Sequence, residues 1–257
     1  MDVVRIFLIF FFTGLFQVTS LIGQEPEELV TDRPDQTESS RTVPHKAFQI
    51  EGGFLLGSTI IDESTLWEYS FPSILLRYGL FRGFELRLGD QFKSTRYINN
   101  DSLNTINGID DLTFGVKFNL MKGQGLIPEM AMIISGSIPI GSPDYTQKMV
   151  VPSIIMAASH SIAQSVGLGY NLGWIGPVNV HGGSLIYSLV VGTSFKKLGA
   201  FAEIYGSWIH FHSMELKFDG GITLLIRENI QWDASGGLGL NTRTWFLSTG
   251  MSIRLPG

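Results

Sequence analysis

The chain has 257 residues, a formal net charge of -5 and no cysteine. The acidic balance argues against a nucleic-acid partner, and the absence of cysteine excludes disulfides, thiolate metal ligands and a cysteine nucleophile. Charged residues make up only 16% of the chain, whereas glycine occurs 30 times and phenylalanine 18 times. This composition is typical of many short strands joined by tight turns.

Residues 1–23 predict a signal peptide. Arg5 precedes the apolar run 6–16, and small and polar residues follow up to Gly23. The apolar run is shorter than the roughly 20 residues that a spanning helix needs, but it fits the central part of an export signal. We therefore expect export with cleavage after Gly23; an uncleaved anchor is the alternative.

Residues 24–46 predict a polar arm. Pro26, Pro34 and Pro44 interrupt this segment and exclude a long helix. Acidic side chains outnumber basic ones in it. We expect an extended segment that precedes a single larger domain, residues 47–257.

From residue 47 onward, apolar residues alternate with polar or small ones. The clearest case is GIDDLTFGVKFNL at 108–120, where large apolar residues from Leu112 to Leu120 alternate with polar residues or glycine. Such a period of two gives a strand one apolar and one polar face. The predicted strands are 48–56, 67–75, 84–89, 108–120, 127–138, 149–160, 166–175, 185–195, 198–209, 215–226, 230–238 and 244–255.

Two architectures can place the apolar faces. A soluble β-sandwich buries them against a second sheet, whereas a transmembrane barrel turns them to lipid. No later segment has twenty uninterrupted apolar residues, and a closed barrel is the other structure that can cross a bilayer. The sequence predicts long connections at 93–107, 139–148 and 176–183, and short ones at 80–83, 122–125, 196–197 and 227–229.

Outer-membrane barrels alternate short periplasmic turns with longer outer loops in this way. The sequence therefore predicts an all-β fold, an antiparallel transmembrane β-barrel of about 12 strands. A secreted β-sandwich that acts as a binding module is the alternative.

Several motifs carry a resemblance to a known family. GIDDLTFGVKFNL at 108–120, TDRPDQTESS at 31–40, VPHKAFQIEGG at 43–53, YGLFRGFELRLG at 78–89 and PIG at 139–141 resemble bacterial outer-membrane proteins of the MetA-pathway phenol-degradation family, also named transporters. The resemblance implies a Gram-negative outer-membrane barrel that passes small solutes, apolar or aromatic ones among them. It supplies no catalytic residues.

The expected partners are outer-membrane lipids, a small-molecule solute and the barrel-insertion machinery. Outer-membrane barrels commonly end on an aromatic residue that this machinery reads. Here the chain ends in Leu255, Pro256 and Gly257, which departs from that pattern.

The polar parity of the strands predicts which charged residues line the lumen. The candidates are Glu51, Glu85, Arg87, Asp111, Lys117, Glu129, Lys217, Asp219, Asp233 and Arg254. Opposite charges on neighbouring strands can pair across a sheet, so we expect a narrow path for small solutes.

The arm carries charges of both signs and directly precedes the first strand. We expect residues 31–41 to fold into or against the periplasmic mouth and to pair lumen charges such as Lys117 and Arg254. The side chains that would do so are Asp32, Arg33, Asp35, Glu38 and Arg41. A disordered periplasmic leader is the alternative.

A hydrolase in the barrel wall is the rival class of function. His210 and His212 share one face of a strand end, with Ser213 and Glu215 nearby, and can form a nucleophile–base pair or half a metal site. Imidazoles at a strand–loop junction are also typical of solvated rim residues. We expect no enzymatic activity, no cofactor and no metal site.

Overall fold

The computed structural model describes residues 28–99, 102–176, 182–210 and 212–257. The predicted signal peptide, the first residues of the arm and most of the connection 176–183 lie outside these ranges. Over the described residues, no helix is long and apolar enough to cross a membrane.

Thirteen strands form one antiparallel sheet in the described part of the chain. They are β1 (Phe48–Ile61), β2 (Ser64–Phe81), β3 (Phe84–Asn99), β4 (Ser102–Ile109), β5 (Leu112–Met121), β6 (Glu129–Ile138), β7 (Val151–Ala163), β8 (Val166–Ile175), β9 (Ser184–Phe195), β10 (Leu198–Ile209), β11 (Ser213–Arg227), β12 (Ile230–Gly239) and β13 (Thr244–Leu255).

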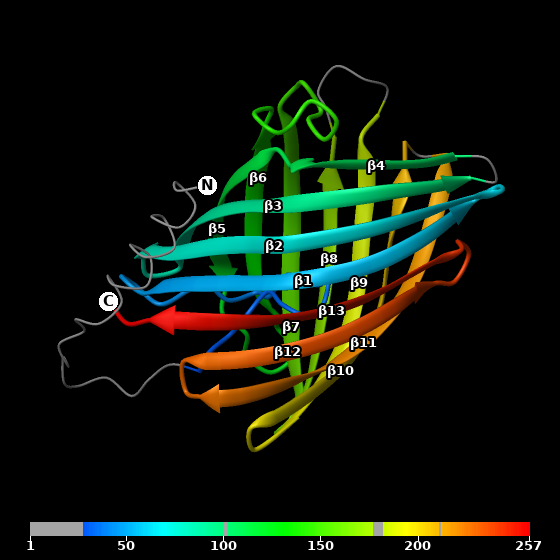
Figure 1. Cartoon of the computed structure of the whole chain (residues 1–257). Helices are drawn as coiled ribbons and strands as arrows, with labels where there is room; N and C mark the ends of the chain where they lie inside the picture. Colours follow the sequence, from blue (N-terminus) through cyan, green and yellow to red (C-terminus); the bar gives the residue numbers. More distant parts are fainter. Residues whose placement is uncertain (1–27, 100–101, 177–181, 211) are drawn as a thin grey trace.

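All of these strands except β4 close into a barrel. The first strand pairs with the last, with Phe48 opposite Leu255 and Thr59 opposite Thr244. Closure pairs the backbone groups that an open sheet edge would expose to lipid. In Figure 1, β1–β3 cross in front of β6–β9 at a steep angle, as the tilted opposite walls of a barrel do. The predicted barrel of about 12 strands is confirmed, and the β-sandwich alternative is wrong.

The region between β3 and β5 differs from the prediction. Residues 93–107 are not a loop, because β3 continues to Asn99 and pairs with β4 over Phe92–Asn99. Nearer its start, β3 pairs with β5 over Phe84–Gly89. The predicted strand 108–120 is therefore broken at Asp110 and Asp111, between β4 and β5. Segment 93–107 is rich in polar residues and was therefore predicted as a loop, but β3 and β4 form a hairpin there that extends beyond the closed part of the barrel.

Burial follows the membrane pattern. Outward residues such as Phe114 and Leu247 are apolar, with 48% and 57% of their surface exposed, whereas the inward Arg77, Glu85 and Lys117 are fully buried. A water-soluble core shows the opposite arrangement. The apolar face therefore lies outside, where it meets lipid.

One irregularity in β2 changes which residues face inward. The pairing of β2 with β1 and with β3 shifts between Ser70 and Ser73. Such a shift exchanges the two faces of a strand. Past the shift Arg77 lies opposite Gln49 and Arg87, so its side chain enters the lumen.

Candidate functional site

The arm, residues 28–46, lies inside the barrel (Figure 1) and joins the wall at Gly79. The backbone N–H of Lys46 donates to the carbonyl of Gly79 over 2.6 Å, and the N–H of Gly79 donates to the carbonyl of Ala47 over 3.0 Å. A Cβ at Gly79 would overlap the carbonyl oxygen of Pro44. Glycine therefore permits this close approach of the arm.

Three basic side chains lie together on neighbouring strands and form what we call the cationic wall: Arg77 on β2, Arg87 on β3 and Lys117 on β5. The guanidinium of Arg77 donates to both carboxylate oxygens of Glu85, over 2.8 and 2.9 Å, and to Glu51 over 2.7 Å. Bidentate pairs of this kind are among the strongest polar contacts in proteins.

The arm adds two carboxylates to the cationic wall. Asp32 lies 3.0 Å from Arg77 Nη1, 2.6 Å from Arg87 Nη1 and 3.0 Å from Lys117 Nζ. Both oxygens of Glu38 accept from Arg87 Nη2, over 3.0 and 2.8 Å. Burial alone would raise the pKa of Asp32, but the charges of Arg77, Lys117 and Arg87 outweigh it and hold that pKa well below its usual value.

On the other side of the lumen, two carboxylates form what we call the acidic wall: Glu203 on β10, which contacts the arm, and Asp219 on β11, directly opposite it in register. Glu203 accepts from the backbone N–H of Gln36 over 2.7 Å and from the hydroxyl of Thr37. Asp219 is fully buried, and no donor from the described residues reaches its oxygens. Burial, and next the charge of Glu203, raises the pKa of Asp35 well above its usual value.

A third contact fixes the start of the arm. Arg33 Nη2 donates to Asp233 over 3.0 Å and to Ser248 Oγ over 3.0 Å. The guanidinium lies against Gly53 and Gly250, which are opposite each other on β1 and β13. A side chain at either glycine would occupy the space of the guanidinium.

The remaining lumen candidates lie nearer the ends of the barrel. Glu129 pairs with the half-exposed Arg41 over 3.1 Å, and Lys217 pairs with Glu215 over 2.8 Å. Arg254 donates to the backbone carbonyl of Glu28 over 3.0 Å. The side chain of Arg254 therefore contacts the backbone of the arm.

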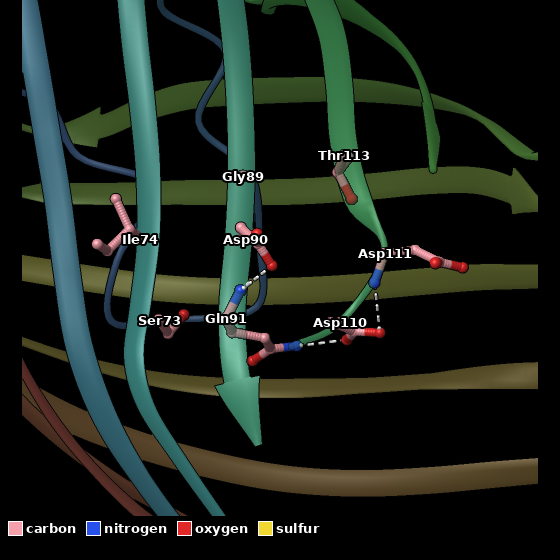
Figure 2. Close-up of a pocket in the computed structure, with 8 residues that line it drawn as sticks. All are labelled: Ser73, Ile74, Gly89, Asp90, Gln91, Asp110, Asp111 and Thr113. Atoms are coloured by element: carbon pink, nitrogen blue, oxygen red, sulfur yellow. Dashed lines mark hydrogen bonds between the residues drawn. The ribbon is translucent and has the colours of Figure 1, made fainter. Parts of the chain in front are cut away.

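Asp111 lies at the break between β4 and β5 and holds the connection that follows β6. Its carboxylate accepts from the backbone N–H groups of Gly141 and Gln147, over 3.0 and 2.8 Å. Beside it is a pocket of about 200 Å³, where the Gln91 amide donates to Asp110 over 3.0 Å (Figure 2). These contacts hold the connection between β6 and β7 in place.

The residues considered for hydrolysis are spread around the exposed turn between β10 and β11. His210 and His212 are both exposed. In the described ranges, no three His, Asp or Glu side chains are grouped so as to hold a metal ion.

Two functional residues escaped the sequence reading. Arg77 has the same parity as the outward Trp67 and Tyr69, and only the shift in β2 turns it inward. Glu203 lies in β10, where Phe201 and Tyr205 share its inward parity and blur the alternation. Pro72 lacks the N–H that a regular strand uses, so it is a sequence signal that could have predicted the irregularity in β2.

A cavity of about 890 Å³ lies between the arm and the wall. Its lining includes Ser39, Ser159, Gly169, Val190 and Phe201, so it borders β7–β10. The arm thus crosses the lumen from the cationic wall to the acidic wall, and this cavity lies beside it.

Comparison with known proteins decides the family. The model of the family described as "Putative MetA-pathway of phenol degradation" matches residues 31–255. The chain belongs to this family. The match begins in the arm and ends in β13, so it includes both the arm and the barrel of this MetA-pathway family member. The resemblance seen in the sequence motifs is thus confirmed.

Solved outer-membrane barrels share the fold of this MetA-pathway family member. The COG4313 outer membrane channel from Pseudomonas putida F1 superposes with a TM-score of 0.65 at 11% identity, over 84% of this chain and 98% of that one. The KdgM porin gives 0.53 at 9%, over 80% and 98%. The translocator domain of the autotransporter NalP from Neisseria meningitidis gives 0.51 at 11%, over 84% and 90%. No curated protein matches the sequence.

Proposed function

We propose that this protein is an outer-membrane channel for small solutes and that its arm, residues 28–46, is a gate inside the lumen. The observation that carries the proposal is a closed barrel with an apolar exterior whose lumen holds a charged segment of the same chain. The similar channel and porin structures support the first part. We further propose export by the signal peptide, assembly by the barrel-insertion machinery, and apolar or aromatic compounds among the solutes.

The contacts of the arm suit a part that moves. Over the described residues, backbone-to-backbone bonds between arm and barrel are confined to Lys46 and Ala47 at Gly79. Residues 31–41 are held instead through side chains, as in the pairs of Asp32, Arg33 and Glu38. These contacts can break without opening any strand pair of the barrel.

Deletion of residues 31–41 tests the gate. We expect higher single-channel conductance in planar bilayers than for the full-length mature protein, because removal of the arm widens the lumen. Heat-dependent mobility on a mild detergent gel verifies that the barrel still folds. Unchanged conductance would favour a leader without a gating role, and loss of folding would make the arm structural.

Cell fractionation tests the location. The protein is expected in the outer-membrane fraction. Recovery as a soluble periplasmic protein would contradict both the barrel and the channel.

A further inference from the structure

The cationic wall has more basic groups than the barrel neutralises. Within the described part of the barrel, Arg77, Arg87 and Lys117 form ion pairs with two barrel carboxylates, those of Glu51 on β1 and Glu85 on β3. Both of these contact Arg77 at 2.7 and 2.8 Å, whereas Arg87 reaches Glu85 only at 3.3 Å. The ion pairs of Lys117 are with Asp32 and Glu38, both from the arm.

The arm therefore occupies two adjacent places shaped for carboxylates. In one, Glu38 accepts from Arg87 with both oxygens. In the other, both oxygens of Asp32 accept from Lys117 Nζ, over 3.0 and 3.2 Å, while Arg87 Nη1 reaches the same carboxylate. The guanidinium of Arg87 spans the two places, because each of its terminal nitrogens serves one of them.

Movement of the arm would leave Arg87 and Lys117 without these partners. A charge that keeps its buried position after losing its partner is strongly destabilising. An entering carboxylate can replace Asp32 or Glu38 through the same charge-assisted bonds, and the fork of an arginine matches a carboxylate in geometry. Neutral solutes cannot make this replacement.

We infer that Arg87 and Lys117, supported by Arg77, form a binding site for the carboxylates of small organic acids, for which the arm is a built-in competitor. A monocarboxylate fills one place and a short dicarboxylate fills both. This inference rests on the proposed channel function and specifies its substrate class. It also makes the solute the agent that displaces the gate.

Hydrogen exchange of the arm tests the competition. The full-length mature protein in detergent is incubated with sodium succinate at fixed pH and ionic strength, and with succinamide as the neutral matched control. We expect succinate to remove exchange protection from residues 33–43 in a saturable way, whereas succinamide leaves it unchanged. Equal effects of the two compounds, or none from either, would overturn the inference.

Calorimetric titration with succinate compares three variants. Asp32→Asn with Glu38→Gln weakens the competitor, because the arm loses its charge-assisted bonds to Arg87 and Lys117, and is expected to tighten succinate binding at least tenfold. Arg33→Gln loosens the arm at Asp233 but keeps the site, so binding also tightens. Arg87→Gln with Lys117→Gln loosens the arm and removes the site, so binding is lost.

The contrast between the last two variants separates a site from a merely loose arm. Succinate binding that persists in Arg87→Gln with Lys117→Gln, or that fails to tighten in Asp32→Asn with Glu38→Gln, overturns the inference. Heat-dependent gel mobility verifies folding, and Lys117→Gln alone replaces the double variant if that variant does not fold; binding as tight as in the parent protein then counts against the site.

Failure of the channel is a different result. It appears as absent conductance in every variant, including the one that lacks residues 31–41. Exchange and calorimetry need no ion current, so they report on the carboxylate site in either case.

Discussion

The cationic wall and the acidic wall hold the same arm in opposite ways. On β2, β3 and β5, each basic side chain faces carboxylates at 2.6–3.0 Å, as Arg87 does with Asp32 and Glu38. On β10 and β11, Glu203 receives only hydrogen bonds from the arm, and Asp219 receives none from the described residues. The cationic wall attracts the arm by charge. At the acidic wall, the carboxylate of Asp35 on the arm lies near the carboxylates of Glu203 and Asp219.

This difference indicates a gate that is balanced. Oppositely charged groups attract each other strongly in a low-dielectric lumen. Carboxyl groups that lack a basic partner there are harder to ionise, and they repel each other once ionised. The cationic wall therefore draws the arm in, and the acidic wall limits how firmly it stays. The following changes test this contrast, beginning with the largest expected effect.

Arg77→Met should destabilise the barrel most. It removes the closest ion-pair partner of the buried Glu51 and Glu85, and breaking a buried ion pair costs about 3–5 kcal/mol. Urea unfolding in lipid vesicles, followed by tryptophan fluorescence, measures the change. The matched control Arg82→Met lies at an exposed turn and should change stability by about 0.5 kcal/mol or less. Equal losses in both variants would mean that the cationic wall carries no special weight.

Phe114→Arg tests which side of the sheet is the lumen. Its side chain is exposed on the outer face, where a charge near the bilayer midplane costs about 2–4 kcal/mol. Thr113→Arg places the same charge on the inner face and should assemble better. The yield of heat-modifiable barrel measures both, and similar yields would contradict the assignment of the walls to the lumen.

Asp219→Asn should stabilise the barrel. The change removes a buried carboxylate that no donor from the described residues reaches, and burying an unpaired charge costs more than burying a neutral polar group. A gain of about 1 kcal/mol in the free energy of unfolding by urea is expected. Asp233→Asn is the comparison, since it loses the Arg33 pair and should destabilise. The same sign in both variants would remove the distinction between paired and unpaired carboxylates.

The arm should dock less firmly as pH rises. The docked state raises the pKa of Asp35 through burial and the charge of Glu203, so docking favours its protonated form, and this contribution is lost as pH rises through the raised pKa. Asp32 acts in the opposite sense. Docking lowers its pKa, so its charged form stabilises the docked arm, and this contribution is lost only in strong acid. Hydrogen exchange of residues 33–43, compared with Asp35→Asn at each pH, should show a pH-dependent difference. A constant difference would exclude this role of Asp35.

The barrel was largely predictable from the sequence because alternation records which face meets lipid. The predicted strands 166–175 and 198–209 coincide with β8 and β10. The hairpin of β3 and β4 was not predictable in this way, since segment 93–107 is polar at many positions of both parities. There the strand signal is weak, and backbone pairing with neighbours decides the structure.

The lumen was predictable only where strands are regular. Glu85, Arg87 and Lys117 follow from parity, and the structure places them beside the arm. Arg77 did not follow, because one shift in β2 reverses every later side chain of that strand. The pairing of Asp32 with three different strands depends on how the barrel closes, which no local pattern contains.

The attachment of the arm at Gly79 has a consequence for how the channel senses its surroundings. Because Lys46 and Ala47 stay bound there, the carboxylates of Asp32 and Glu38 remain close to their site even when released. A short tether of this kind gives a binding group an effective concentration of about millimolar. A free acid must exceed that level to displace the arm, so the length of the tether sets a concentration threshold for opening.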